Sequence, residues 1–426
     1  MNVGLLGLGV VGGGVLSALS RNGSTVPRSV GRPIRVARIL VRDPDKPRDV
    51  EFDRQILTAD AASVLKDPSI DIVAEAMGGE YPALDYIRTA LEAGKSVVTA
   101  NKEVMAKHGP ELLELAARRG AHLLFEASVG GGIPILGPLT RSLRGNEIRG
   151  IRAIINGTTN YILTKMSHEG TEFADALREA QELGYAEADP TNDVEGIDAG
   201  YKLAILASLA FHTRVAAEDI HLEGISRLTG RDFRYARELG YVIKLVAIAT
   251  DRDGSVEARV HPALVPEDAP LAKVDGVLNA VEVEGDLVDR VLFHGRGAGS
   301  MPTASAMVGD ILEVAWSMAN GLPAAGFLTL DREVSLCPIS DLVTRYYIRA
   351  TVLDRAGVLA QMASILGNLQ ISIASVIQKE VGLNDGTAEL VITTYHSRER
   401  DVQQALRELA GLDVVKEIGN LLRVEE

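Results

Sequence analysis

The stretch NVGLLGLGVVGGGVLSALS, residues 2–20, contains an apolar run, a glycine-rich turn and a helix-compatible segment. Residues 2–6 predict a strand and residues 13–20 predict a helix. The turn between them matches the G-x-G-x-x-G fingerprint in its required setting and consists of Gly7, Leu8, Gly9, Val10, Val11 and Gly12. Because glycines let a backbone approach a pyrophosphate at a helix N-terminus, we expect this turn to bind a dinucleotide. A tight connection without a ligand is the alternative.

The next expected strand, residues 34–41, ends in Arg42 and Asp43. An arginine at this position pairs with the extra phosphate of NADP, whereas a carboxylate accepts hydrogen bonds from the ribose of NAD. Since both are present, we favour NADP bound through Arg42, with NAD also accepted. The alternative for Arg42 is a solvated surface charge.

Strands and helices continue to alternate, with strands expected at 70–76, 96–99 and 122–126 and helices at 81–93 and 103–119. This alternation predicts an α/β fold with a doubly wound parallel sheet, which binds its ligands at the carboxyl edge. Thr99 and Lys102 lie at that edge, where the ammonium group can sit between cofactor and substrate. The alternative is that Lys102 simply begins an amphipathic helix.

A second strand end, at Glu126, leads into Gly130, Gly131 and Gly132. Three successive glycines allow carbonyl groups to turn toward one point. Together with the Glu126 carboxylate they predict an all-oxygen site for a hard cation. An interdomain hinge explains the same glycines.

The segment GYAEADPTNDVEGIDAGYK, residues 184–202, is acidic and precedes an apolar run, LAILASLAF. Asp198 and Lys202 are four residues apart, so on a helix they share one face. A lysine that faces an apolar interior behind a carboxylate can act as an acid or base in hydride transfer between an alcohol and a carbonyl. Glu187 and its acidic neighbours can hold a substrate ammonium group. An ordinary i,i+4 ion pair is the alternative.

Overall composition restricts the class of protein. The chain has 426 residues, a formal net charge of −14 and one cysteine, Cys337. The charge argues against nucleic-acid binding through a basic surface, and one cysteine excludes an intramolecular disulfide or a multi-cysteine metal site. No run reaches about 18 apolar residues and no basic targeting region precedes the first strand, so we expect a cytoplasmic protein without membrane contact.

The remaining pattern predicts two further domains. Expected strands at 148–156, 259–265, 281–283 and 288–293, a turn at 157–160 and helices at 161–167 and 172–183 indicate an α+β domain. After a linker, strands at 346–353, 371–379, 387–394 and 414–418 with helices at 358–369 and 398–409 give the βαββαβ order of a ferredoxin-like module.

Several motifs, in order along the chain, resemble homoserine dehydrogenase: AMGG at 76–79, TANK at 99–102, FEASVGGGIP at 125–134, NGTTNYIL at 156–163, GYAEADPTNDVEGIDAGYKLAIL at 184–206 and GRGAGSMPTASAMVGDI at 295–311. The resemblance implies NAD(P)-dependent interconversion of L-aspartate 4-semialdehyde and L-homoserine, in the biosynthesis of threonine, methionine and isoleucine.

The resemblance also implies roles for individual residues. Lys202 would be the proton donor, Glu187 and Asp198 would bind homoserine, and Asp193 would be a further acid of the pocket. Lys102 would contact cofactor and substrate. The cofactor would also be lined by Thr99, Gly184 and Gly299, and a sodium ion would be held by Glu126 and by carbonyls of Val129, Gly131 and Ile133.

Residues 346–378 resemble an ACT domain, a module that pairs with copies of itself and binds amino acids at the interface. Its ligand turn would be residues 354–357, near Ser372 and Ile373. The resemblance implies feedback control by threonine, in a homodimer or homotetramer. A purely dimerising module is the alternative.

We therefore expect a dinucleotide-binding domain at 1–135 with 300–325 packing back on it, a catalytic and dimerisation domain at 136–299, a linker at 326–344 and a regulatory domain at 345–426. Two other functions stay open: a non-catalytic amino-acid sensor, and a dehydrogenase acting on the amine carbon. Formation of the semialdehyde from an acyl phosphate would need a thiol, and Cys337 lies outside both N-terminal domains.

Overall fold

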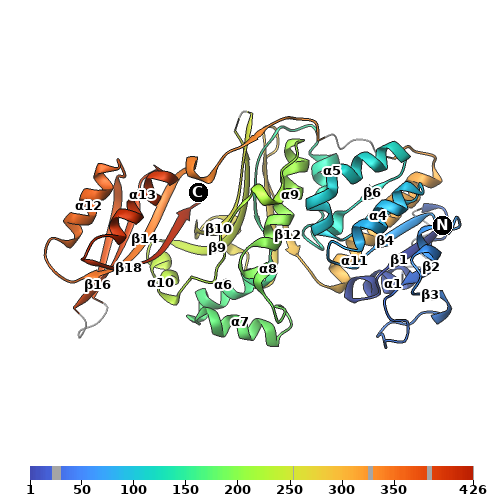
Figure 1. Cartoon of the computed structure of the whole chain (residues 1–426), viewed down its shortest axis with the longest axis horizontal. Helices are drawn as coiled ribbons and strands as arrows, with labels where there is room; N and C mark the ends of the chain where they lie inside the picture. Colours follow the sequence, from blue (N-terminus) through green and yellow to red (C-terminus); the bar gives the residue numbers. More distant parts are fainter. Residues whose placement is uncertain (22–29, 253, 325–329, 381–385, 426) are drawn as a thin grey trace.

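The computed structural model describes residues 1–21, 30–252, 254–324, 330–380 and 386–425. Its three regions follow one another along the longest axis (Figure 1), with the N-terminal sheet at one end and the C-terminal module at the other. Residues 326–329, at the start of the predicted linker, lie outside the described residues, as does residue 325, at the end of the segment predicted to pack back on the N-terminal domain.

The N-terminal region is a parallel sheet with the strand order β3-β2-β1-β4-β5-β6. Its strands are β1 (Asn2–Leu6), β2 (Arg35–Leu40), β3 (Leu57–Thr58), β4 (Ile72–Glu75), β5 (Ser96–Thr99) and β6 (Leu123–Leu124). Its helices are α1 (Val10–Arg21), α3 (Ala62–Leu65), α4 (Ala83–Glu92) and α5 (Lys102–Arg119). The order reverses between β1 and β4, which makes their carboxyl ends the ligand crevice of a doubly wound sheet. The predicted α/β class is confirmed.

The helix α11 (Ser300–Ala319) returns to this sheet from far along the chain. Its residues Ala304, Met307 and Ile311 are buried in one apolar cluster with residues of β1 and α1. The approach is close because Gly14 has no side chain: a Cβ there would lie 2.8 Å from the Ser300 carbonyl.

The middle region is an antiparallel sheet with helices on one face. Its strands run in the order β12-β11-β7-β9-β10 and are β7 (Ile148–Ile154), β9 (Tyr241–Asp251), β10 (Ser255–Pro266), β11 (Leu278–Gly285) and β12 (Asp289–Arg296). Its helices are α6 (Gly157–Glu169), α7 (Phe173–Glu182), α8 (Thr191–Val194), α9 (Ile197–Phe211) and α10 (Gly230–Glu238). The short strands β8 (His221–Leu222) and β13 (Ser335–Leu336) pair with β10.

The turn predicted at 157–160 is wrong, because these residues form the first turn of α6. Asn156 caps that helix by accepting a hydrogen bond from the Thr159 amide, 2.8 Å away. An Asn N-cap satisfies an otherwise unpaired amide and starts a helix even where the following residues have modest helix propensity.

The C-terminal module has the predicted βαββαβ order. It comprises β14 (Val343–Leu353), α12 (Val358–Asn368), β15 (Ile373–Glu380), β16 (Thr387–Thr394), β17 (Ser397–Arg398), α13 (Glu399–Ala410) and β18 (Val415–Val424). The main sheet order is β18-β14-β16-β15, and the helices α12 and α13 contact one another.

The middle sheet and the sheet of the C-terminal module are continuous. Strand β18 pairs with β10 in parallel, with Ala263 opposite Arg423 and Leu264 opposite Val424. The C-terminal module is therefore joined to the middle region by backbone hydrogen bonds, which the sequence did not indicate.

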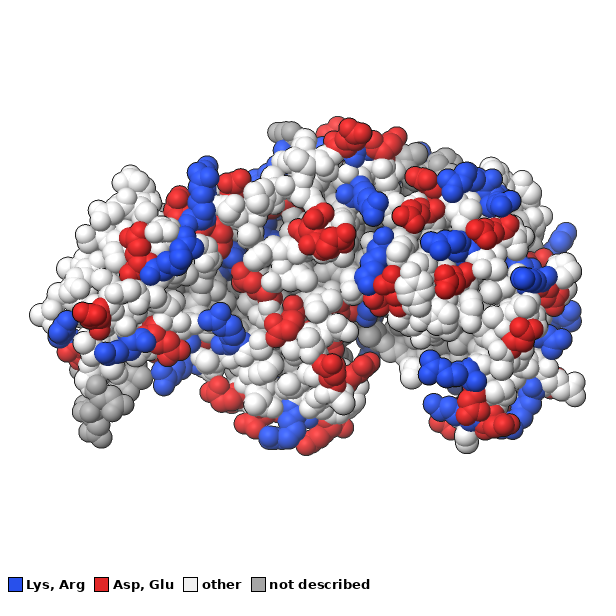
Figure 2. Space-filling model, viewed as in Figure 1, with Lys and Arg blue, Asp and Glu red and all other residues white. Residues whose placement is uncertain are grey.

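The visible face carries Lys and Arg interspersed with Asp and Glu (Figure 2), without one dominant sign of charge. Within the described residues, the longest helices are too short or too polar to cross a membrane.

Candidate functional site

Three charged side chains from two regions meet at one point. On α9, Lys202 Nζ donates a hydrogen bond to Asp198 Oδ2 at 2.6 Å and to the Ile155 carbonyl at 2.9 Å. From the start of α5, Lys102 forms an ion pair with the other oxygen of the same carboxylate, Oδ1. The structure therefore brings the predicted residues Lys102, Asp198 and Lys202 together between the N-terminal and middle regions.

The first turn of α9 places these groups. Gly196 precedes the helix with a left-handed φ of 78°, a conformation that glycine adopts without strain. Asp198 then lies in the first turn, where a negative charge interacts favourably with the helix dipole. The apolar residues that follow bury the helix, so the side chains of Asp198 and Lys202 are only 4% and 11% exposed, whereas that of Lys102 is 44% exposed.

Burial and the charges of the neighbouring groups together set the pKa values of this cluster. Burial alone would raise the pKa of Asp198, but the ammonium groups of Lys202 and Lys102 outweigh burial and hold it well below its ordinary value. Burial lowers the pKa of Lys202 below 10.5, assisted by Lys102 and opposed by Asp198. For Lys102, burial also favours the neutral amine, but Asp198 prevails and the pKa is raised. Lys202 is thus the lysine that more readily gives up a proton.

Asn156 is a member of this site that the sequence analysis missed. Its Nδ2 donates to Asp193 Oδ1 at 2.6 Å and to Asp198 Oδ2 at 2.9 Å, while its Oδ1 caps α6. Asp193 therefore joins the cluster through an amide bridge. The signal available in the sequence was the N-cap pattern of Asn156 before α6.

The remaining predicted acid lies at the edge of the cluster. The Glu187 side chain is exposed, and its charge contributes to the raised pKa of Lys102. It follows the turn at Gly184, where φ is 74°. Thr158 donates to the Tyr185 carbonyl at 2.7 Å, which fixes this turn against the start of α6.

The glycine turn after β1 has the shape that a dinucleotide pyrophosphate requires. A Cβ at Gly12 would lie 2.2 Å from the Gly7 carbonyl, and one at Gly7, where φ is 93°, would lie 2.8 Å from the Ala76 carbonyl. Val10 at the start of α1 is 72% exposed, although it is apolar. The backbone is therefore tightly packed on one side and open on the other, as a nucleotide cradle must be.

Two other predicted cofactor contacts lie near this turn. Gly299 has a φ of 124° and precedes α11, and the next residue, Ser300, donates from its hydroxyl to the Val10 carbonyl at 2.8 Å. Arg42 is exposed just beyond the end of β2. Both therefore lie at the carboxyl edge of the parallel sheet.

Thr99 differs from the simplest expectation because its side chain is buried. Its hydroxyl donates to Glu75 Oε2 at 2.5 Å and accepts from the Asn101 amide at 3.0 Å. Glu75, fully buried at the end of β4, also accepts from the Met77 amide at 2.7 Å. Burial raises the pKa of Glu75. This network, which the sequence analysis did not include, fixes the loop that leads to Lys102.

The predicted cation residues form a loop with a distinctive pattern of bonds. The Glu126 carboxylate accepts from the amides of Ile135, Leu136 and Gly137 at 2.6–2.8 Å. Among the described residues, no backbone amide donates a hydrogen bond to the carbonyl of Val129, Gly131 or Ile133. Carbonyls without a backbone partner beside a half-buried carboxylate are suited to a hard cation.

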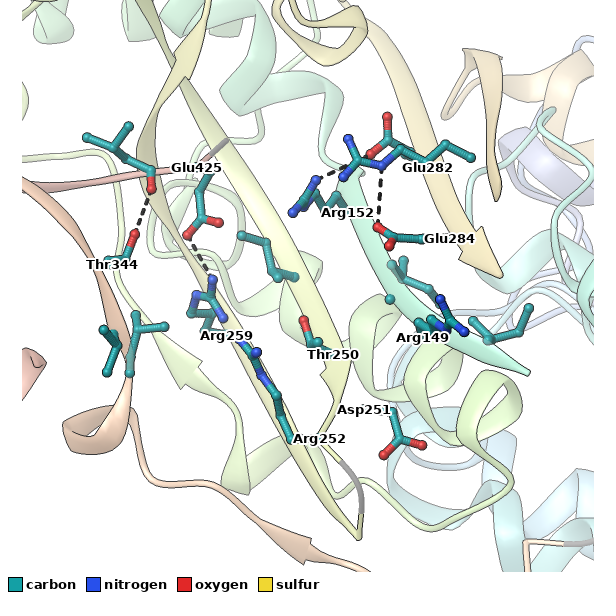
Figure 3. Close-up of a pocket in the computed structure, with 18 of the residues that line it drawn as sticks. Arg149, Arg152, Thr250, Asp251, Arg252, Arg259, Glu282, Glu284, Thr344 and Glu425 are labelled. Atoms are coloured by element: carbon teal, nitrogen blue, oxygen red, sulfur yellow. Dashed lines mark hydrogen bonds and ion pairs between the residues drawn. The ribbon is translucent and has the colours of Figure 1, made fainter. Parts of the chain in front are cut away.

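A large polar cavity of about 670 Å³ lies elsewhere, between the middle sheet and the start of the C-terminal module (Figure 3). Arg149, Arg152 and Glu282 line it from one side and Thr344 and Glu425 from the other. None of the residues of the lysine–aspartate cluster lines this cavity. The chemistry proposed below therefore does not involve it.

Comparison with known proteins identifies the family. Residues 134–312 match the model of homoserine dehydrogenase, residues 7–126 match the homoserine dehydrogenase NAD-binding domain, and residues 346–414 match the ACT domain. A homoserine dehydrogenase of Synechocystis sp. is 46% identical over 433 residues, covering 100% of this chain and 99% of the relative.

The chain belongs to the homoserine dehydrogenase family. It is accordingly an NAD(P)-dependent oxidoreductase that acts on a CH–OH group. A solved homoserine dehydrogenase from Thiobacillus denitrificans is 43% identical and has a TM-score of 0.93, covering 100% of this chain and 98% of its own. The fold and the family predicted from the sequence are both confirmed.

A shorter member of the homoserine dehydrogenase family gives a second comparison. A hyperthermophilic archaeal homoserine dehydrogenase, solved in complex with NADPH, is 29% identical with a TM-score of 0.63 and covers 74% of this chain and 97% of its own. Members of this family therefore differ in length by about the size of a C-terminal module.

Proposed function

We propose that Lys202 transfers the proton in the interconversion of L-aspartate 4-semialdehyde and L-homoserine. The observation that carries this assignment is the set of partners of its ammonium group. An ammonium has three N–H donors, and two are used by Asp198 and the Ile155 carbonyl. The third is left for a substrate oxygen at the open side of the cluster.

NADP or NAD would supply or accept the hydride when bound at the glycine turn. During reduction of the aldehyde, Lys202 protonates the developing alkoxide, and its lowered pKa favours release of that proton. During oxidation, the neutral Lys202 amine accepts the proton of the alcohol. Lys102 stays protonated beside it and stabilises negative charge on substrate or cofactor.

The acids divide between positioning the lysines and binding the substrate. Both oxygens of Asp198 already have cationic or amide partners. Asp198 therefore mainly positions the two lysines, and it contacts homoserine only where the substrate lies next to them. Glu187 is exposed, and Asp193 has one oxygen engaged by Asn156. We assign the ammonium group of the substrate to Glu187 and Asp193.

Comparison of L-homoserine with 4-hydroxybutyrate, which lacks the amino group, tests this assignment. We expect kcat/KM for NADP-dependent oxidation to be at least about 100-fold higher for homoserine, since charge-assisted hydrogen bonds contribute about 1.5–3 kcal/mol each. Glu187→Gln should reduce this preference, and Glu182→Gln, on the preceding helix, should not. Release of ammonia from homoserine would instead indicate attack at the amine carbon. Absence of turnover would favour a sensor.

We propose NADP as the preferred cofactor and sodium as a bound cation. Exposed Arg42 supports the first, and the carbonyls of the 129–133 loop beside Glu126 support the second. The Glu126 carboxylate has about four lone-pair sites, and the amides of 135–137 use three of them, which leaves one for a cation. Sodium chloride, compared with choline chloride at equal ionic strength, should raise the melting temperature of the protein.

We further propose that L-threonine inhibits the enzyme by binding to the C-terminal module. The turn at 354–357 is exposed and ends in Gly357, whose φ of 89° is a left-handed conformation that glycine adopts without strain. Ser372 is exposed near the start of β15. Titration of initial rates with threonine tests this proposal, and unchanged rates would leave the module an assembly domain. The homodimeric or homotetrameric state, the cytoplasmic location, the domain boundaries and the role in threonine, methionine and isoleucine biosynthesis stay predictions.

A further inference from the structure

A buried arginine of the C-terminal module reaches into the middle region. Arg423 on β18 is 1% exposed and donates to both oxygens of Glu399 at 2.8 and 2.9 Å. The same guanidinium donates to both oxygens of Glu223 at 2.8 and 2.9 Å. Glu399 belongs to the module, whereas Glu223 follows β8 of the middle region. Two bidentate pairs on one guanidinium fix all three side chains relative to one another.

Glu223 belongs to a short segment, residues 221–226, that is tied to the middle sheet. Its backbone amide donates to the Val260 carbonyl of β10 at 2.8 Å, and His221 contacts its carboxylate at 2.8 Å. The same strand β10 pairs with β18 beside Arg423. The position of the segment is therefore set jointly by the sheet and by the C-terminal module.

The other side of the segment contacts the backbone between Asp193 and Asp198. Ile225 donates from its amide to the Val194 carbonyl at 2.8 Å, and Ser226 donates to Glu195 at 2.8 Å. Val194 and Glu195 lie between Asp193 and the start of α9. The packing is tight: a Cβ at Gly224 would lie 2.6 Å from the Val194 carbonyl.

The first turns of α9 rest on the same segment. A Cβ at Gly200 would lie 2.9 Å from the Leu222 side chain. Gly200 lies between Asp198 and Lys202 on the helix. A shift of residues 221–226 by even a fraction of an ångström would therefore move both the backbone next to Asp193 and the first turns of α9, which carry Asp198 and Lys202. Close-packed interiors have few voids that could absorb such a shift.

We propose that Glu223, held by Arg423 of the C-terminal module, is a positioning residue for Asp193 and Asp198 in homoserine binding. This inference rests on the proposed function, since it uses the substrate roles assigned above. The module is expected to act on the reaction through substrate geometry, with the segment 221–226 as the physical link. The nucleotide turn lies on the other side of the active site, in the N-terminal region, so the segment 221–226 is expected to leave nucleotide affinity unchanged.

Glu223→Gln in the full-length protein tests the inference, because the amide keeps the shape but loses the second charge-assisted acceptor. We expect KM for L-homoserine to rise about 5- to 20-fold, corresponding to the loss of one to two hydrogen bonds at about 0.5–1.5 kcal/mol each. The Kd for NADPH should stay within twofold of the wild-type value. Arg423→Lys should raise the same KM, since a lysine cannot make two bidentate pairs.

A matched control is a buried carboxylate at the same junction that does not touch the segment. Glu389 is fully buried and pairs with Arg349 and Tyr235. Glu389→Gln should lower the melting temperature without changing KM for homoserine. If Glu223→Gln does not fold, Ser226→Ala is the second variant, because it removes only the exposed hydrogen bond between Ser226 and Glu195. This variant should raise KM for homoserine about two- to fivefold.

The two possible failures are distinguishable. If the wild-type protein does not oxidise homoserine, the proposed function is wrong. If the wild type is active and Glu223→Gln and Ser226→Ala both retain its KM while losing only thermal stability, Glu223 has a structural role and the inference is wrong.

Discussion

At the scale of single residues, the environment of Lys202 sets the pH dependence of the reaction. Burial lowers its pKa below 10.5, and Asp198 opposes this effect. Oxidation of homoserine needs the neutral amine, so kcat/KM for oxidation should rise with pH and level off below 10.5, whereas reduction should fall over the same range. A pH–rate profile in both directions measures this midpoint.

Asp198→Asn should move that midpoint to lower pH, because the carboxylate is the group that favours the charged lysine. We also expect a loss of about 10²-fold or more in kcat from misplacement of both lysines. Asp189→Asn is a matched control, since Asp189 is exposed and bonds locally to Thr191. A midpoint that stays unchanged in Asp198→Asn would contradict the assignment of Lys202 as the titrating group.

Arg42 should determine the choice between the two nucleotides. Arg42→Ala removes a charged partner for the 2′-phosphate, so KM for NADP should rise about 10- to 100-fold while KM for NAD changes less than about threefold. Arg38→Ala serves as the control, because Arg38 lies on β2, the strand that precedes Arg42, and bonds to the Gln55 carbonyl. Equal effects on both nucleotides would mean that Arg42 does not contact the phosphate.

At the scale of elements, the strand–turn–helix of the nucleotide site depends on contact between backbones. A side chain at Gly12 would lie 2.2 Å from the Gly7 carbonyl, whereas one at Gly13 would meet nothing within 4 Å. Gly12→Ala should therefore destabilise the protein by about 1–3 kcal/mol and weaken NADPH binding. Gly13→Ala should be neutral or stabilising by up to about 1 kcal/mol. Thermal unfolding with and without NADPH distinguishes the two, and similar behaviour would contradict this packing.

Helices and strands with clear hydrophobic periodicity, or with glycine or capping residues at their ends, were predictable from the sequence. β5 and β16 have the predicted bounds, and α5 differs from its prediction by one residue at the start. β9 was missed, because it is buried on both faces and carries Lys244 in its middle. That lysine donates to the Val274 carbonyl at 2.6 Å and to Asp275 at 2.9 Å, contacts that no local pattern indicates.

In the candidate active site, too, the residues that sequence patterns did not predict are those held by contacts distant in sequence. Lys102, Asp198 and Lys202 were predictable because a strand end and a helical spacing placed them. Asn156 and Glu75 were not, since each acts through partners distant in sequence: Asp193 for Asn156 and Thr99 for Glu75. Long-range polar pairs depend on tertiary structure, which periodicity alone does not encode.

At the scale of the whole molecule, buried charges fasten the C-terminal module to the middle region. Arg349 on β14 bonds to Asp232 on α10 at 2.7 Å and to Glu389 on β16 at 3.2 Å. Asp232 also accepts from Asn420 on β18 at 2.7 Å. All these side chains are at most 8% exposed. The module is therefore an integral part of this chain, although shorter members of the family exist.

Arg349→Met should lower stability strongly, because it leaves Asp232 buried without its cation and Glu389 with only the half-exposed Arg231 as a cation. Breaking such a buried pair costs about 3–5 kcal/mol. Arg231→Met is the control: Arg231 contacts the same Glu389 at 3.4 Å but is 49% exposed, so its loss should cost less than about 1 kcal/mol. Denaturant unfolding measures both values. Equal losses would mean that the junction is not held by its buried charges.

The most direct test of the central claim is NADPH oxidation by Lys202→Met with L-aspartate 4-semialdehyde, measured beside NADPH binding. We predict that kcat falls about 10²- to 10⁴-fold, while the Kd for NADPH stays near the wild-type value. Lys107 on α5 forms ion pairs with Glu80 and Glu103. The control variant Lys107→Met should keep the wild-type kcat. A Lys202→Met enzyme with kcat within threefold of wild type would show that another group transfers the proton.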